Sequence, residues 1–247
     1  MTETNPLARS HELLWNGLPE PTKGPRPTLT LDQIVSAGIE LADTEGLDAL
    51  SMRRLASNLG VGTMSLYRYI PSKIELLHLM LDRVSSTSPE RTANPGATWR
   101  ETLDRVARAG RKMYTSHPWL LKVNWSRPVI GPNMIADLEL TFQGLTDLPF
   151  TDQEKMVVVS SLDSYVTGTV RQEILYADAA SETGITEAEF WELQLPFLEK
   201  AMNSGRFPAM ASMDEDTFDA GWDETFERGL TFILDGIESE VAKRNNH

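Results

Sequence analysis

Residues 51–73 read SMRRLASNLGVGTMSLYRYIPSK and contain two short helical patterns separated by a glycine. The first pattern begins at the capping hydroxyl of Ser51, places apolar residues at i, i+3, i+4 and i+7, and ends at Gly60. The second pattern runs over residues 63–70 and ends before Pro71, which cannot continue a helix without losing a hydrogen bond. Two short helices joined by a tight turn with glycine predict a helix-turn-helix, whose second helix can enter a DNA major groove.

The charge of this window supports the same interpretation. Between Ala49 and Ile74 the chain has no Asp or Glu, although its formal net charge is -13. The basic residues of the window are Arg53, Arg54, Arg68 and Lys73. Because Lys and Arg contact phosphate, an acid-free surface suits a polyanion. An acidic remainder would repel DNA except at this face, although acidity also simply keeps a protein soluble.

From about Pro27 to Val84 the sequence resembles the N-terminal domain of TetR/AcrR-type transcriptional regulators. The matching features are a first helix with Ile34, Ala37, Ile39, Leu41 and Ala42, a break at Gly46, the run SMRRLASNLGV, and LYRYIPSK before Leu76 and Leu77. The C-terminal run FERGLTFILDGIE also resembles the last helix of one regulatory-domain group. Gly62 departs from the family's usual Ser or Thr cap, and Ile70 from its usual Phe. We expect Thr63 to supply the cap and Ile70 to fill the same core site.

The resemblance implies an all-α fold in which a three-helix helix-turn-helix domain is joined by a connector helix to a larger helical dimerisation and ligand-binding domain. It implies a transcription factor, most often a repressor, that binds a palindromic operator as a homodimer. A small molecule in the second domain would release the operator. No catalytic residue, cofactor or metal ligand is expected.

The resemblance also assigns candidate roles within residues 51–73. The candidates for contacts with base edges are Thr63, Met64, Ser65 and Tyr67. The candidates for contacts with phosphate are Ser51, Arg53, Tyr69, Lys73 and the backbone N–H of Gly62, and Arg68 suits either role. The expected partner is therefore double-stranded DNA.

The positions of proline- and glycine-rich segments predict that the chain has three parts. Residues 1–27 contain five prolines and are interpreted for the most part as a flexible N-terminal arm, in which Leu13, Leu14 and Trp15 could form a short helix that packs on a neighbour. Residues 28–85 form the helix-turn-helix domain, and the Ser/Thr/Pro/Gly-rich run SSTSPERTANPGA separates it from a helical domain over residues 95–247. Helices are expected over residues 31–45, 73–85, 99–116, 133–145, 152–183, 187–203 and 214–245. In the helix at 73–85, the inward face should carry Ile74, Leu77, Met80, Leu81 and Val84.

Two helices are predicted to mediate self-association. Over residues 214–245 the apolar stripe includes Phe218, Trp222, Phe226, Leu230 and Ile233, while Gly221, Gly229 and Gly236 permit close backbone approach. The run 156–162, which includes Val159, is apolar on nearly every side, as expected for a helix buried by its own domain and by a partner. A two-fold homodimer explains both helices. The alternative, that both belong only to an intradomain core, stays open.

Aromatic residues crowd the second domain and suggest a pocket for a small apolar or aromatic effector. The candidate lining residues are Trp99, Trp119, Trp125, Phe142, Tyr165 and Trp191, with Asp163 and Thr169 as polar contacts. Asp163 is the best candidate because it lies within an apolar run, and a buried carboxylate needs a partner. Each of these residues could equally be an ordinary core or surface residue.

Composition narrows the remaining function classes. The chain has no cysteine, and its four histidines are scattered. It has no phosphate loop, nucleophile elbow or paired metal spacing, so an enzyme is not expected. No apolar run is long enough for a membrane span and no signal sequence is recognisable, so we expect a soluble cytoplasmic protein. Two alternatives remain: a regulator that binds DNA without an effector, and a protein-interaction module that uses the basic helix pair.

Overall fold

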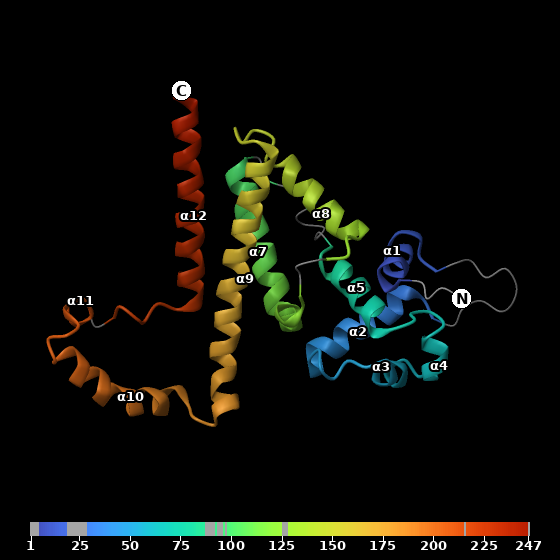
Figure 1. Ribbon diagram of the computed structural model, residues 1–247, viewed down its shortest axis with the longest axis horizontal. Helices are drawn as coiled ribbons and strands as arrows, with labels where there is room; N and C mark the ends of the chain where they lie inside the picture. The colour runs from blue at the N-terminus through green and yellow to red at the C-terminus, as the bar shows by residue number, and fades with distance from the viewer. Residues whose placement is uncertain are drawn as a thin grey trace, which may run out of the picture. The chain divides into compact units, whose positions relative to one another are not determined.

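The computed structural model describes residues 5–18, 29–86, 92, 96, 98–124, 128–214 and 216–246. Every regular element in these residues is a helix, as the sequence predicts (Figure 1). The elements are α1 (Pro6–Asn16), α2 (Leu31–Glu45), α3 (Met52–Asn58), α4 (Thr63–Leu66), α5 (Lys73–Val84), α7 (Trp99–Ser116), the 3-10 helix η1 (Pro118–Lys122), α8 (Pro132–Gln143), α9 (Asp152–Thr183), α10 (Glu187–Met202), α11 (Pro208–Ala211) and α12 (Trp222–Asn245).

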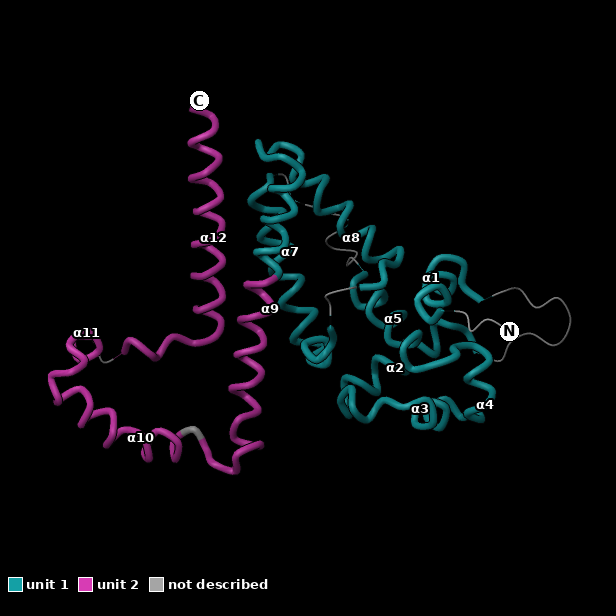
Figure 2. Tube along the Cα trace, in the orientation of Figure 1, with its two compact units in different colours: residues 1–163 teal, residues 164–247 magenta. Residues whose placement is uncertain are grey.

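The chain forms two compact units, residues 1–163 and residues 164–247 (Figure 2). The division falls inside α9, whose first part belongs to the first unit. The helix-turn-helix, η1, α7 and α8 all belong to the first unit. The boundary predicted between residues 85 and 95 separates a DNA-binding part from a sensing part, whereas the two units are separated by compactness. The functional boundary stays a prediction.

Local capping explains the bounds of α2. The Thr30 hydroxyl accepts a hydrogen bond from the Gln33 N–H, and the Gln33 side chain accepts one from the Thr30 N–H. These reciprocal bonds form a capping box. Gly46 ends the helix at φ 83°, a conformation that glycine adopts without steric strain. The predicted helix at residues 31–45 is therefore confirmed, and its buried face includes Ile34 and Leu41.

The buried face of the connector helix α5 matches the predicted one only in part, because Met80 and Leu81 are buried as expected but Leu77 and Val84 are half-buried. Ile74 is 54% exposed, whereas Leu76 and Leu79 are buried along with Met80 and Leu81. The reason is that α5 packs against three helices, α1, α2 and α8, so its buried positions do not form one amphipathic stripe. Glu75 and Asp82 are buried as well.

Residues 6–16 of the expected flexible arm form α1, a longer helix than the short one considered at Leu13, Leu14 and Trp15. Pro6 occupies the first turn, where the N–H that proline lacks would have no partner within the helix, and the Asn5 side chain accepts a hydrogen bond from the Leu7 N–H. The helix packs on α5 and buries Leu13. The Ser10 hydroxyl lies 2.7 Å from Nδ1 of His78. Residues 19–28 lie outside the described part of the chain.

The last helix also differs from prediction, because α12 begins at Trp222 rather than near residue 214. Two turns precede it, with the Thr217 N–H donating to the Asp214 carbonyl and the Asp219 N–H to the Asp216 carbonyl. Gly221 is extended and forms the N-cap. Phe218 consequently lies before the helix and is not part of its stripe.

Within the second unit, α9 and α12 are in direct contact. The Tyr165 hydroxyl donates to the backbone carbonyls of Phe226 and Thr225, at 2.8 and 3.2 Å. The rings of Tyr165 and Phe226 stack with centroids 5.9 Å apart. Gly229 faces Tyr165, and the contact leaves no room for a side chain at residue 229. Of the three glycines predicted to permit close backbone approach, Gly229 therefore does so within the protomer.

Candidate nucleic-acid interface

The turn between α3 and α4 is closed by backbone hydrogen bonds. The Val61 N–H donates to the Ala56 carbonyl at 3.0 Å, and the Gly60 N–H donates to the Ser57 carbonyl at 3.1 Å. Together with φ +66° at Gly60, this is a Schellman motif, which satisfies carbonyls at the end of α3. The second helix of the pair is therefore oriented by backbone geometry. Glycine permits the required left-handed residue.

The core of the pair holds α4 in place and leaves one face of it outward. Leu55 and Leu66 are fully buried, and so is Ile70, which confirms that isoleucine fills the core site at this position. On the outer side, Met64 is 78% exposed and Tyr67 is 40% exposed. The side chains of Met64 and Tyr67 are therefore accessible to a partner on this face of α4.

The predicted cap of α4 is wrong. Gly62, not Thr63, is the N-cap, and no side chain bonds to the free N–H groups there. The helix instead begins with the Gly62 carbonyl, which accepts from the N–H groups of Ser65 and Leu66. Thr63 and Ser65 are half-buried on the first turn, and the Arg68 guanidinium donates to the Ser65 hydroxyl at 3.2 Å.

The phosphate candidates are placed unequally. Ser51 caps α3 by accepting from the Arg54 N–H at 3.2 Å, which leaves its own O–H as a donor, and Arg53 beside it is exposed. Lys73 is half-buried and its ammonium donates to the Leu47 carbonyl at 3.1 Å, so it also anchors the loop before α3.

The remaining basic residue of the window, Arg54, pairs with Glu45 at 2.6 Å. Its positive charge is thus partly neutralised by an acid that lies outside the acid-free window, on α2. Tyr69 is half-buried. The roles of all these side chains at DNA stay predictions.

The candidate effector residues do not share one environment. Trp99 and Phe142 are half-buried, and Trp119 is buried with its indole N–H donating to Asp43 at 2.7 Å. Asp163 is exposed as a whole residue, contrary to the burial expected for it, but its carboxylate accepts a hydrogen bond from Tyr114 and is partly withdrawn from water. Loss of surrounding water raises the pKa of Asp163, and the Tyr114 hydrogen bond opposes this shift.

The candidates of the second unit are largely engaged or exposed. Tyr165 is committed to the α12 backbone, and the Thr169 hydroxyl donates to the Tyr165 carbonyl at 2.9 Å. Trp191 is exposed and makes an edge contact with Phe190. Trp125 lies outside the described residues. A role for any of them in effector binding stays a prediction.

The candidate dimerisation residues differ in how far the protomer buries them. Phe226 and Leu230 are buried within the protomer, whereas Val159, Trp222 and Ile233 are half-buried. Large apolar side chains beside them on α9 and α12 remain exposed in the protomer. These are Met156, Val157 and Phe232.

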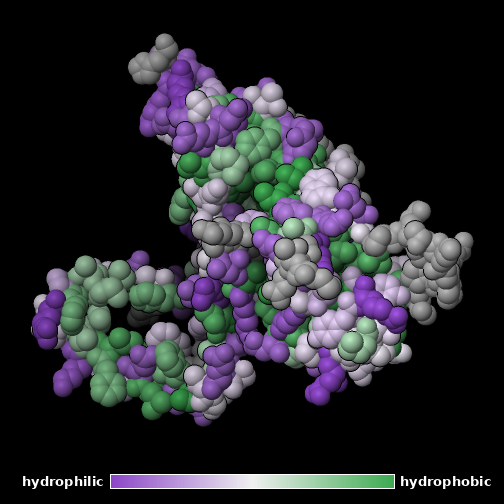
Figure 3. All heavy atoms as spheres, turned by 45° about the vertical axis from the view of Figure 1, so that its right-hand side comes forward, coloured by the Kyte–Doolittle hydropathy of each residue, from purple (hydrophilic) through white to green (hydrophobic). Residues whose placement is uncertain are grey.

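A further apolar surface covers α10 and α11. Figure 3 shows it as the hydrophobic region at the lower left. Its exposed side chains are Phe190, Trp191, Leu193, Leu195, Phe197, Leu198, Phe207 and Met210. So much exposed apolar surface is unusual for a protein that stays monomeric.

Sequence reasoning missed the residues that connect the helix-turn-helix to the rest of the first unit. Asp43, Asp82 and Trp15 bond to residues far away in sequence. No local pattern singles them out. Within the described residues, no helix has the length and apolarity that a bilayer span requires, and no cluster of His, Asp and Glu forms a metal site.

Comparison with known proteins places this geometry in a family. Residues 34–80 match the family model for bacterial regulatory proteins, tetR family, and residues 92–241 match the model for the tetracyclin repressor-like C-terminal domain. The HTH-type transcriptional repressor DrrR1 of Streptomyces coeruleorubidus is 48% identical over 238 residues, which cover 96% of this chain and 88% of that protein. An HTH-type transcriptional regulator of Saccharopolyspora erythraea is 30% identical over 225 residues, covering 91% of each chain.

Solved structures of similar proteins support the same family assignment. Apo ActR from Streptomyces coelicolor has a TM-score of 0.66 at 26% identity, covering 90% of this chain and 100% of ActR. ActR in complex with actinorhodin has a TM-score of 0.67 at 28% identity, covering 86% of this chain and 98% of that one. The chain therefore belongs to the TetR family of bacterial regulatory proteins and is a helix-turn-helix, DNA-binding transcriptional regulator.

Proposed function

We propose that this regulator is a repressor that binds an inverted-repeat operator as a homodimer and is released by a small apolar or aromatic effector. The observation that carries the proposal is the outward face of α4, where Met64 and Tyr67 are exposed on a helix that the Gly60 turn and a buried core hold in place. A fixed short helix with open side chains suits the major groove. The protein named DrrR1 is a repressor, which supports the same direction of control.

The homodimer is supported by unpartnered apolar side chains. Met156 and Val157 on α9 and Phe232 on α12 are exposed in the protomer, at or beside the positions predicted for self-association. Association would remove them from water, and a two-fold axis would present two copies of α4 to one duplex. Paired copies require an operator with two half-sites, about one helical turn apart or a multiple of it.

The effector is proposed on the chemistry of residues 95–247 and on the relatives. Trp99 and Phe142 are half-buried, so aromatic surface remains to contact a ligand. ActR has been solved in complex with actinorhodin, which makes actinorhodin a suitable first probe. We also propose residues 28–85 as the DNA-binding domain and residues 95–247 as the sensing domain, in a cytoplasmic protein that has no catalytic activity.

Selection from a random duplex pool by the purified protein tests the proposal. An enriched inverted repeat, bound by two protomers in sedimentation, is the expected result. Enrichment of no sequence by a folded protein would contradict DNA recognition. Addition of actinorhodin to the enriched complex then tests release, and release by no member of an aromatic compound set would favour a regulator without an effector.

A further inference from the structure

Two carboxylates of the DNA-binding domain bond to elements that follow it in the chain. Asp43 lies near the end of α2, and Asp82 lies near the end of the connector α5. Their partners lie on η1 and on α8, within the same compact unit. We call residues 29–86 the head and residues 98–163 the body. The two carboxylates are therefore two separate polar attachments between head and body.

The attachment at Asp82 is buried and multiple. Its carboxylate accepts hydrogen bonds from the backbone N–H of Asn133 and of Met134, both at 3.1 Å, and from the Asn133 side chain at 2.9 Å. These donors form the N-terminus of α8, which has no side-chain cap of its own. Asp82 thus caps a helix of the body, where a negative charge is also favoured by the helix dipole.

The carboxylate of Asp82 is held from several sides. A Cβ atom on Gly131 would meet the Asp82 carboxylate, so the backbone before α8 packs directly on it. Helix α1 closes the same side: Ser10 bonds to His78 on α5, and the Trp15 indole N–H donates to the Ile130 carbonyl at 3.2 Å. Opening this attachment would leave several buried polar groups without partners, which is strongly unfavourable.

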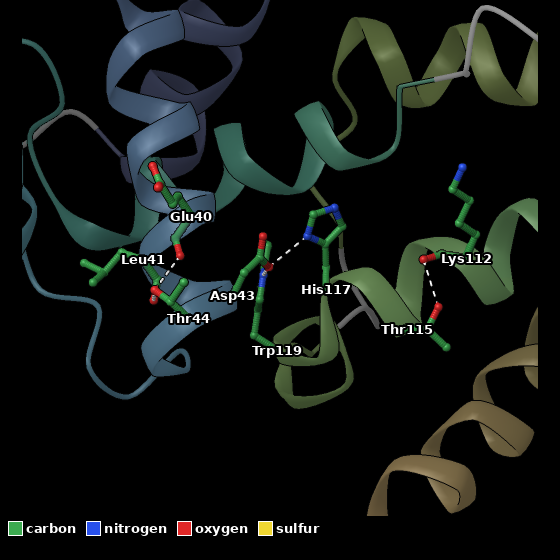
Figure 4. A network of polar contacts seen from close by, with 8 residues as sticks. All are labelled: Glu40, Leu41, Asp43, Thr44, Lys112, Thr115, His117 and Trp119. Carbon is green, nitrogen blue, oxygen red and sulfur yellow. Dashed lines mark hydrogen bonds and ion pairs between the residues drawn. The ribbon is translucent and has the colours of Figure 1, made fainter.

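The attachment at Asp43 is different in kind (Figure 4). One oxygen, Oδ1, lies 2.8 Å from Nδ1 of His117 and 2.7 Å from the indole nitrogen of Trp119. The side chains of His117 and Asp43 are 24% and 26% exposed. Water can therefore reach this contact and replace its hydrogen bonds when it opens.

The contact also joins the head to the end of a body helix. The His117 N–H donates to the Met113 carbonyl at 2.9 Å and closes α7, while the His117 carbonyl accepts from Leu120 in η1. A change in the position of the α7 terminus therefore changes the position of the imidazole that faces Asp43.

We propose that the Asp43–His117–Trp119 contact is a releasable latch, and that the Asp82 attachment to α8 is the hinge about which the head turns when the latch opens. The inference rests on the proposed function and deepens it, because it names the contacts that set the orientation of α4. An effector acts through the latch only if it binds the latched and unlatched arrangements with different affinity. Asp43 is a positioning residue and touches neither DNA nor effector.

Distance measurement within the protomer tests the latch without any DNA. The chain has no cysteine, so labels can be placed at Asn58→Cys on α3 and Ala136→Cys on α8, both exposed positions. Doubly labelled protein is diluted into unlabelled protein so that distances between protomers do not contribute. In the Asp43→Ala variant, the distribution of distances between these labels is expected to widen.

Asp48→Ala is the matched control. Asp48 belongs to the same head and pairs with Lys122 of η1 at 3.7 Å, but its side chain is 93% exposed. An exposed pair of this kind contributes little, so the distribution should stay as in the unsubstituted protein. Asp43→Asn, which keeps an acceptor for Trp119 but loses the charge facing His117, should widen the distribution less than Asp43→Ala.

Three results would overturn the inference. The first is an unchanged distribution in Asp43→Ala, with cooperative unfolding retained. The second is equal widening in Asp48→Ala. The third is a wider distribution in Asp82→Asn than in Asp43→Ala, with cooperative unfolding retained in both, because the Asp82 attachment would then be the one that opens. Failure of the duplex selection would refute the proposed operator binding but would leave these distances, and hence the latch, to be decided separately.

Discussion

A Cβ atom on Gly229 would overlap the hydroxyl oxygen of Tyr165, so α9 and α12 approach each other here only because residue 229 has no side chain. The Tyr165 hydroxyl cannot retreat without losing its hydrogen bonds to the backbone of α12. This contact decides how the second unit responds to substitution.

We predict that Gly229→Ala lowers the free energy of unfolding. Overpacking of a tight contact costs about 1–3 kcal/mol, which exceeds the roughly 0.5–1 kcal/mol gained by replacing glycine inside a helix. Gly168→Ala on α9 is the control, because nothing lies within 4 Å of a Cβ there, and it should show the gain alone. Urea unfolding at a fixed, high protein concentration measures both. Equal stability of the two variants would show that Tyr165 adjusts without cost.

The turn of the helix-turn-helix offers a second pair of substitutions with opposite expected effects on stability. Gly60 has φ +66°, where an L-residue is strained by roughly 1–2 kcal/mol, so Gly60→Ala should destabilise the protein by about that amount. Gly62 has a negative φ, and a Cβ there meets only Ser65 Oγ at 3.8 Å. Gly62→Ser adds the missing cap and should stabilise by a few tenths of a kcal/mol, roughly the difference between Ser and Gly caps. Thermal unfolding with opposite signs for the two variants is the expected result.

His78 makes stability depend on pH. Burial lowers the pKa of His78 below 6.5, Glu75 partly opposes this shift, and His11 adds to it. Because the folded protein resists protonation of this ring, the contribution is fully present above about pH 6.5 and is lost as the pH falls through the lower folded pKa. His78→Gln should remove this part of the pH dependence of unfolding. An identical pH profile in the variant would exclude His78 as its source.

The pKa of Asp163 is raised, whereas that of His78 is lowered. Its raised pKa means that the folded state favours the neutral carboxyl, so the ionised form at neutral pH is destabilising. Asp163→Asn retains an acceptor for Tyr114 and should be more stable than the unsubstituted protein near pH 7. The advantage should disappear as the pH falls through the folded pKa of Asp163 toward its usual value of 3.8. An advantage that persists at low pH would point to a cause other than ionisation.

Local signals explain which elements could be predicted. The bounds of α2, α7 and α9 follow the sequence because caps and glycines near them act over a few residues. The start of α12 was missed because apolar periodicity continues through Phe218, while Gly221 and the turns before it set the actual beginning. Over residues 1–27 the prolines were interpreted as marks of a flexible arm, although Pro6 lies in the first turn of a helix, where proline is favoured.

The connecting contacts could not be predicted in this way. Asp43 and His117 are 74 residues apart, and Asp82 and Asn133 are 51 residues apart. Such pairs form only because α2 and α5 pack against η1 and α8. The aromatic residues show the same limit of local sequence signals. A high aromatic content suggested a ligand pocket, but Trp119 and Tyr165 instead donate hydrogen bonds to neighbouring helices.

The central claim is that the outer face of α4 reads the DNA sequence, and the specificity ratio tests it most directly. The enriched duplex and an unrelated duplex are titrated at one salt concentration with the unsubstituted protein, with Thr63→Ala and with Tyr67→Ala. The account predicts a preference of about 10³-fold or more for the enriched duplex, and a ratio about 5- to 150-fold lower in each variant, with dimerisation and non-specific binding retained. An unchanged ratio in both variants would show that sequence is read elsewhere and would contradict the account.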